Sequence, residues 1–191
     1  MNRELLKRLE AYNELYKEES IKAERLKTYL QENDMGAFLR CKYPAHFTAS
    51  AWLLSRTGDK VLLAEHKKLN KLIQPGGHWE KSDQNLFQTA LRELKEETGI
   101  GRVSGDQNNI FHIDIHKIPA NTHEPGHLHY DITYLFVCED EKIEINTKEL
   151  KHAEWYSLEE LKKANIEDDA LNSMIFKTAS VILYERNLNI L

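Results

Sequence analysis

The sequence predicts an α/β or α+β sandwich that forms one domain over residues 35–191 and carries a helical arm over residues 1–34. Helical apolar spacing runs through residues 3–33, and short apolar segments typical of strands follow it. Further helical stretches separate those segments. Strands that alternate with helices along a chain favour a sheet covered by helices.

The composition supports a folded protein and limits its partners. Hydrophobic residues make up 41% and charged residues 30% of the 191 residues, which is enough apolar side chain for a core and unlike a disordered chain. The net charge of -5 argues against broad binding to a phosphate backbone. We therefore expect no nucleic-acid partner.

Signals for another compartment are absent from the sequence. No apolar run approaches the ~20 residues that cross a bilayer, and residues 1–8 lack the apolar core of a signal peptide. Cys41 and Cys138 are far apart and form no CxxC pair, so neither a disulfide framework nor a cysteine zinc site is expected. We expect a cytoplasmic protein with no membrane partner.

The first segment, residues 3–33, has the spacing of one helix or a pair of helices. Its apolar positions follow alternating steps of four and three, and Glu19 is the one polar interruption. We favour an amphipathic arm folded back on its own domain. The alternative is a helix–helix contact in a homodimer, because heptad spacing suits one. Turn chemistry at Asn33, Asp34 and Gly36 ends the segment.

The next segments are short and extended. Phe47 to Ser55 predicts a buried strand, and a turn at residues 57–59 joins it to a second strand from Lys60 to Glu65 as a hairpin. Residues 72–74 are extended and run into Pro75-Gly76-Gly77, which predicts a sharp glycine-bearing loop.

The helix from Leu86 to Glu97 has the clearest periodicity in the chain. At roughly 100° per residue, Phe87, Ala90, Leu91 and Leu94 fall on one side. Asp83 or Ser82 is the expected N-cap, and Gly99 stands where a C-cap is expected.

The last third of the chain alternates again and then ends in helices. Residues 110–118 and 128–137 predict two strands joined by a loop with two prolines and a glycine. Residues 157–160 have the spacing of a capping box, and residues 168–185 predict the last helix.

Three carboxylates on the helix give the strongest chemical signal. Glu93, Glu96 and Glu97 are related by steps of three and four, so they share one helical face. Like charges at that spacing destabilise a helix, and a hard divalent ion removes the conflict because Mg²⁺ and Mn²⁺ prefer carboxylate oxygens. A glycine-bearing loop upstream can bring backbone groups against a metal or a phosphate.

The stretch from Gly77 to Ile100 resembles the Nudix box. That box is a glycine, five residues, a glutamate, seven residues, and then Arg-Glu-aliphatic-any-Glu-Glu-any-Gly-aliphatic. Residues 92–100 match the second half at every fixed place. Counting from Gly77, the first glutamate slot holds Asp83, and eight residues precede Arg92. We favour this count because a loop absorbs an inserted residue more easily than a helix does.

The resemblance implies a Nudix-type α/β/α sandwich with a mixed sheet, and a Nudix hydrolase domain over residues 35–191. It implies a pyrophosphohydrolase that uses Mg²⁺ or Mn²⁺ to cleave a nucleoside diphosphate linked to another moiety: a nucleotide sugar, an ADP-ribose-like molecule or a nucleoside triphosphate. The alternatives are a nucleotide-binding regulator without hydrolysis and, less favoured, an isoprenoid diphosphate isomerase.

The site residues follow from their places in the box. The resemblance implies that Glu96 and Glu97 are the principal metal ligands and that Glu93 completes the metal shell directly or through water. It further implies that Arg92 holds one of these glutamates, with the Gly76 carbonyl as a further ligand. The expected catalytic set is thus Glu93, Glu96, Glu97 and Arg92, and the general base stays unassigned.

Substrate contact is expected from residues near the glycine loop and from a cluster of histidines. Gly77, His78 and Trp79 lie at the loop. His112, Asp114 and His116 share one face of their strand by the two-residue period, as His127, His129 and Asp131 do on the next. Three interpretations stay open: a substrate pocket, a second metal site, because imidazole binds Zn²⁺, Mn²⁺ or Fe, and a solvated sheet face.

Overall fold

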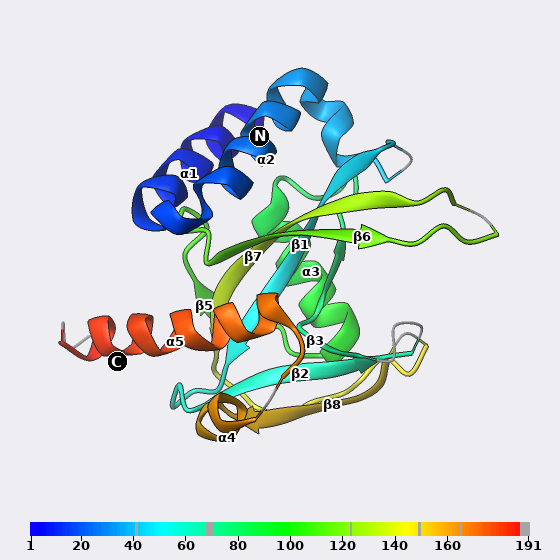
Figure 1. The fold of residues 1–191 in the computed structure, drawn as a ribbon. Coiled ribbons are helices and arrows are strands. Elements are labelled where there is room, and N and C mark those ends of the chain that lie inside the picture. The colour runs from blue at the N-terminus through cyan, green and yellow to red at the C-terminus, as the bar shows by residue number, and fades with distance from the viewer. Residues whose placement is uncertain (41, 68–70, 123, 149, 165, 188–191) are drawn as a thin grey trace.

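The computed structural model describes residues 1–40, 42–67, 71–122, 124–148, 150–164 and 166–187 (Figure 1). Within these residues, eight strands form one sheet. Their bounds are β1 (Ala45–Leu54), β2 (Lys60–His66), β3 (Lys71–Ile73), β4 (Gly76–His78), β5 (Val103–Gly105), β6 (His112–Ile118), β7 (His127–Cys138) and β8 (Leu150–Ser157).

The sheet is mixed, as the resemblance implies. The strands run in the order β3-β2-β1-β7-β5, while β4 pairs with β1, β6 with β7 and β8 with β2. The central pair, β1 and β7, is parallel over the whole of β1, from Ala45 opposite Leu128 to Leu54 opposite Val137. The other pairs are antiparallel. A parallel central pair needs a long crossover, and here that crossover carries the helix with the three glutamates.

Helices cover both faces of the sheet, which confirms the sandwich (Figure 1). The arm and the central helix share one hydrophobic core with one face, and the two C-terminal helices share another core with the opposite face. The helices are α1 (Asn2–Leu15), α2 (Ser20–Asn33), α3 (Leu86–Thr98), α4 (Leu158–Lys163) and α5 (Asp169–Asn187), with short 3-10 turns η1 (Lys17–Glu19) and η2 (Asp34–Phe38).

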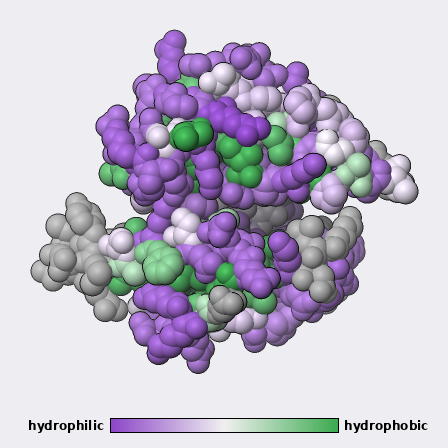
Figure 2. Space-filling model, viewed as in Figure 1, coloured by the Kyte–Doolittle hydropathy of each residue, from purple (hydrophilic) through white to green (hydrophobic). Residues whose placement is uncertain are grey.

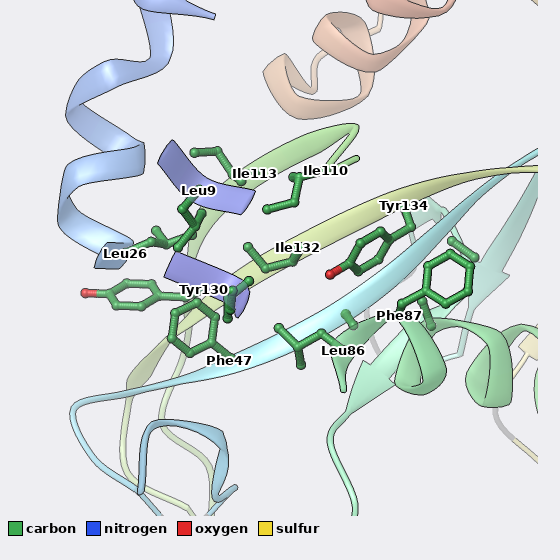
Figure 3. Close-up of a cluster of buried hydrophobic side chains, with 14 of the residues drawn as sticks. Leu9, Leu26, Phe47, Leu86, Phe87, Ile110, Ile113, Tyr130, Ile132 and Tyr134 are labelled. Atoms are coloured by element: carbon green, nitrogen blue, oxygen red, sulfur yellow. The ribbon is translucent and has the colours of Figure 1, made fainter. Parts of the chain in front are cut away.

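The first core joins the arm to the sheet and to α3. Figure 3 shows Leu9 and Leu26 from the arm beside the sheet residue Ile113, and Phe87 from α3 beside Tyr134. Both leucines are fully buried, and burying such a side chain stabilises a fold by about 1.5–3 kcal/mol. The arm therefore packs on its own chain, which confirms the interpretation of a folded-back arm.

The opposite face of β1 is divided along its length. Its C-terminal half presents Trp52 and Leu54 to the core under α4 and α5, and the indole N–H of Trp52 donates to Thr178 Oγ1 at 2.8 Å. Its N-terminal half presents polar side chains at the alternate positions His46, Thr48 and Ser50. That polar half is the part of the sheet that bears on function.

Several predicted elements differ from the observed ones. Gly76 and Gly77 form the strand β4 against β1 instead of a loop, because the backbone there pairs with residues 48–50. The strands β5 and β8 were not predicted, since each is held by pairing with a strand distant in sequence. Cys41 lies outside the described residues, and Cys138 is buried and free.

The surface agrees with the polar composition. Figure 2 shows hydrophilic residues over most of the face it draws. Among the described residues, no helix has the length and the apolar character that crossing a membrane requires.

Candidate active site

The helix α3 carries the three glutamates and Arg92, and both of its ends are capped locally. It begins after Asn85, whose Oδ1 accepts a hydrogen bond from the Gln88 N–H at 3.0 Å, and it ends at Gly99, whose φ of 75° is the left-handed conformation that favours glycine. The expected N-cap at Asp83 or Ser82 is therefore wrong. Asp83 makes other contacts, which hold the site together.

Asp83 anchors Arg92. The guanidinium donates to both carboxylate oxygens of Asp83 at 3.0–3.3 Å, and Asp83 also accepts from the Thr89 hydroxyl and the Glu80 N–H, each at 3.0 Å. Burial by itself would raise the pKa of Asp83, but these hydrogen bonds outweigh burial and lower that pKa. Asp83 is thus a charged, buried support at the start of the helix.

Arg92 in turn contacts two of the three glutamates. Its NH1 group donates to Glu93 at 2.9 Å and to Glu96 at 3.1 Å, while NH2 donates to the His78 carbonyl oxygen at 2.7 Å. The contact between Arg92 and a glutamate that the box implies is therefore present. Because one rigid guanidinium reaches both α3 and β4, it fixes the distance between helix and strand.

The third glutamate faces β4 directly. Glu97 is 4% exposed, and its Oε2 accepts from the Gly76 N–H at 3.2 Å. The Glu93 side chain is 14% exposed, and that of Glu96 is 56% exposed. The three carboxylates thus differ in exposure, with Glu97 buried, Glu93 largely buried and Glu96 open to solvent.

The two glycines of β4 allow this close approach. A Cβ on Gly77 would lie 2.5 Å from Glu93 Oε1, and a Cβ on Gly76 would lie 2.7 Å from the Ala49 carbonyl oxygen. The Gly76 position is closed by backbone atoms of β1, whereas the Gly77 position is occupied by the carboxylate at the end of the Glu93 side chain. Glycine is therefore required at residue 76 by contact with β1, and at residue 77 it leaves room for the Glu93 carboxylate of α3.

The donors of this site fit a hard divalent cation. Four carboxylates, including that of Asp83, lie on or beside α3, and oxygen donors of this kind suit Mg²⁺ or Mn²⁺. The three glutamates converge less tightly than the sequence suggested, because Arg92 holds Glu93 and Glu96 while Glu97 turns to β4.

The predicted polar surface exists and is larger than the sequence indicated. In the β6–β7 pairing Asp114 lies opposite Asp131 and His116 opposite His129, so the predicted side chains share one face of the sheet. The polar positions of β1 join them, because His46 pairs with His129 and Thr48 with Asp131. His112 has different surroundings from the other predicted residues, because it is 1% exposed and contacts Lys177 of α5.

Asp131 lies at the centre of this polar surface. It is 3% exposed and accepts hydrogen bonds from the hydroxyls of Thr48 at 2.7 Å, Ser50 at 3.0 Å and Thr133 at 3.1 Å. Burial raises its pKa in spite of these donors.

Five imidazole rings pack beside Asp131. His46 and His129 have ring centroids 4.8 Å apart, and the remaining contacts among the rings span 4.9–5.2 Å. Burial lowers the pKa of His46, lowers that of His78 to about 3 and lowers that of His129 to about 2. These three imidazoles are therefore neutral at physiological pH. The five rings, His46, His78, His116, His127 and His129, are called the histidine cluster below.

Trp79 directly follows the glycine strand β4 and contacts Phe38 of η2. Its ring centroid is 6.0 Å from that of Phe38, and its indole N–H donates to the Asp83 carbonyl oxygen at 3.0 Å. It remains half-buried, so it supports the Asp83 anchor and also borders the site.

His46, Thr48 and Ser50 were missed by sequence reasoning. The segment from Phe47 to Ser55 was expected to be a buried strand, which hid the alternation of apolar and polar residues from Ala45 to Ser50. Starting the strand at Ala45 would have shown that alternation.

A family model described as "NUDIX domain" matches residues 44–174 of the chain. The chain is also 32% identical over 109 residues to a "Probable DHNTP pyrophosphohydrolase" of Lactococcus lactis subsp. cremoris (strain MG1363), covering 56% of this chain and 64% of that relative. It is 30% identical over 130 residues to a "Putative 8-oxo-dGTP diphosphatase YtkD" of Bacillus subtilis (strain 168), covering 54% of this chain and 81% of the relative. The chain thus spans less than two thirds of the first relative.

Solved structures share the fold. A hydrolase of the NUDIX family from Clostridium perfringens is 29% identical, with a TM-score of 0.56 over 71% of this chain and 97% of that one. The NUDIX domain of Shewanella oneidensis NrtR, solved with ADP ribose, is 20% identical, with a TM-score of 0.54 over 81% of this chain and 97% of that one. At 20% identity, the similarity to the NrtR domain shows only that the fold is shared.

Proposed function

The chain belongs to the NUDIX domain family, and from this premise we propose that it is a metal-dependent pyrophosphohydrolase acting on a nucleoside diphosphate linked to another moiety. The observation that carries the proposal is the acidic face of α3, which Arg92 holds against β4. The resemblance of residues 92–100 to the second half of the Nudix box, with Asp83 as the buried partner of Arg92, supports it further.

In this proposal each residue of the face has a distinct task. Glu96 and Glu97 bind Mg²⁺ or Mn²⁺, Glu93 completes the shell, and the Gly76 carbonyl is a further ligand. When bound, such an ion neutralises the diphosphate and lowers the pKa of a coordinated water. Arg92 is a positioning residue, because it aligns Glu93 and Glu96 through charge-assisted hydrogen bonds and is itself held by a hydrogen bond to Asp83.

The substrate lies against β4 and the polar half of the sheet. Gly77 and His78 border the diphosphate, and Trp79 offers a half-buried ring beside them. The polar surface around Asp131 contacts the part of the substrate beyond the diphosphate. Phosphoryl transfer asks mainly for positioning and charge stabilisation, which rigid strands supply better than loops.

Both curated relatives are named for cleavage of a pyrophosphate bond, one in DHNTP and one in 8-oxo-dGTP. Because 8-oxo-dGTP is a nucleoside triphosphate, we place nucleoside triphosphates first among the candidate substrates, before nucleotide sugars and ADP-ribose-like molecules.

A product-identified activity screen tests the function. Purified protein is incubated with triphosphates (including DHNTP and 8-oxo-dGTP), nucleotide sugars and dinucleotides, with Mg²⁺, Mn²⁺ or a chelator. We expect a monophosphate-bearing product from at least one compound, and only in the samples that contain Mg²⁺ or Mn²⁺. The absence of turnover across the panel, combined with thermal stabilisation by one of its nucleotides, would overturn hydrolysis in favour of a nucleotide-binding regulator.

Gly77→Ala tests the contact between β4 and α3. The added Cβ would displace the Glu93 carboxylate, which is the end of a flexible side chain, so the free energy of unfolding should change by less than about 1 kcal/mol. The displaced carboxylate should lower kcat by about 10- to 100-fold, since small misplacements in an active site are costly.

Gly36→Ala is the matched control for Gly77→Ala, because a Cβ on Gly36 meets no atom within 4 Å. Steady-state kinetics and urea unfolding of both variants give the comparison. Equal kcat values for Gly77→Ala and the unaltered protein would remove Glu93 from the metal shell.

A further inference from the structure

We propose that His46, His127 and His129 form a second metal site, which binds a transition-metal ion such as Zn²⁺ through three imidazole nitrogens. This inference does not rest on the proposed hydrolysis. One ligand atom from each residue lies within 4.8 Å of the other two, and no other group of three potential ligands in the described ranges is this tight.

The distance between the ring nitrogens of His127 and His129 suits tetrahedral coordination of one ion. The Nε2 atoms of His127 and His129 are 3.3 Å apart. Two nitrogens that bind one Zn²⁺ at about 2.0–2.1 Å in tetrahedral geometry lie roughly 3.3–3.4 Å apart. The ligand atom of His46 lies within 4.8 Å of the other two, so the trio closes on one ion with a movement of at most about 1.5 Å.

His46 carries an independent sign of a missing partner. The residue is fully buried, and its Nε2 has no hydrogen-bond partner among the described residues. A buried polar atom without a partner costs about 1–3 kcal/mol. A metal ion at this position would satisfy the lone pair of Nε2 and remove that cost.

Backbone carbonyls already orient two of the ligands. His46 Nδ1 lies 3.3 Å from the Lys42 carbonyl oxygen, and His127 Nδ1 lies 2.9 Å from that of Pro125. Each Nδ1 must donate there, so each Nε2 keeps its lone pair for a metal. Metal-binding histidines are commonly held in this way by a carbonyl or carboxylate on the other ring nitrogen.

The third ligand requires only a proton shift. With Nε2 of His127 an acceptor, the contact between the two rings is a hydrogen bond donated by His129 Nε2–H. When the ion enters, that proton moves to His129 Nδ1 and Nε2 becomes a ligand. His129 is half-buried, so an ion has access to the site from its side, and three protein ligands leave a fourth position for water.

The site is separate from the acidic face of α3 but adjoins it through β4. His78 packs its ring against His46 at 5.1 Å, while its carbonyl oxygen accepts from Arg92. Imidazole donors suit Zn²⁺, Co²⁺ or Ni²⁺, whereas the carboxylate oxygens of the glutamates suit Mg²⁺ or Mn²⁺. The two sites would therefore select different ions.

Zinc binding by variants of the full chain tests the proposal. Metal-stripped protein competes with a chromogenic chelator for Zn²⁺, and Co²⁺ reports tetrahedral coordination through its visible absorption. We expect one tightly bound equivalent in the unaltered protein. The affinity for Zn²⁺ should fall by about 100-fold or more in His127→Ala and in His129→Gln. His129 is half-buried, so the fold should tolerate the second substitution.

Two controls separate this site from the proposed active site. His152→Gln removes a histidine whose side chain is 56% exposed on β8, and it should bind Zn²⁺ as the unaltered protein does. The double variant Glu96→Gln/Glu97→Gln should also keep its zinc affinity although it lacks the proposed Mg²⁺ ligands. Loss of zinc in that double variant, or full affinity in both histidine variants, would overturn the proposal.

Discussion

Replacing Glu97 by Gln is expected to lower kcat by about 10³-fold or more while the protein stays folded. Gln keeps the length of the side chain and an oxygen that can accept from the Gly76 N–H, a bond now 3.2 Å long. It removes the negative charge that a divalent ion requires from its ligand. Because Glu97 is almost wholly buried, no neighbouring water-exposed carboxylate can readily take its place.

The comparison needs a control and a measure of folding. Glu139→Gln changes an exposed carboxylate outside the site and should leave kcat unaltered. Steady-state kinetics with the substrate found in the screen, at several concentrations of Mg²⁺ and Mn²⁺, gives the effect, and circular dichroism shows whether each variant is folded. Undiminished turnover by folded Glu97→Gln would exclude Glu97 as a metal ligand and weaken the assignment of the whole acidic face.

The local part of the site was predictable from the sequence. The spacing of Glu93, Glu96 and Glu97 fixes their common face as soon as a helix is assumed, and the apolar positions of the same segment require that helix. Gly99 as the C-cap was equally local, and its left-handed backbone confirms it. Such features depend on residues a few positions apart, and the geometry of a helix is known in advance.

Features that depend on distant partners were not predictable. Three residues before the helix are of types that cap helices well: Ser82, Asp83 and Asn85. Asn85 is the N-cap in the structure, because the Asp83 carboxylate is hydrogen-bonded to Arg92. The strand β8 carries charged residues and Trp155 in a weak alternation, and its pairing with β2 is what makes it a strand. The histidine cluster likewise combines β1, β4, β6 and β7, whose register the sequence does not state.

The fold explains why Glu19 is polar at a position where the pattern of the arm calls for an apolar residue. It interrupts the apolar spacing of the arm, and the structure places it opposite Lys177 of α5, with 2.6 Å between Oε1 and Nζ. Lys177 also donates to the Tyr12 hydroxyl at 2.5 Å, and that hydroxyl donates to Glu19 at 2.5 Å. Burial alone would raise the pKa of Glu19, but the hydrogen bonds from Lys177 and Tyr12 lower it, so the carboxylate is ionised at neutral pH.

Lys177→Met is therefore expected to destabilise the protein by about 3–5 kcal/mol, the cost of leaving one member of a buried ion pair without its partner. Methionine keeps the apolar stem of Lys177 against the rings of Tyr12 and Tyr16. It leaves the Glu19 carboxylate, whose side chain is 12% exposed, with the Tyr12 hydroxyl as a hydrogen-bond partner and His112 Nδ1 3.8 Å away. Urea unfolding measures the loss, and Lys163→Met, at a side chain 78% exposed on α4, is the control.

A double-mutant cycle decides whether the ion pair itself carries the effect. Glu19→Gln removes the buried charge that Lys177→Met leaves behind, so the double variant should recover a large part of the stability lost in Lys177→Met. The recovery follows because two neutral partners avoid the desolvation cost of one unpaired carboxylate. If the losses of the two single variants simply add, Glu19 and Lys177 are not coupled, and the arm is held to the domain by its apolar contacts alone.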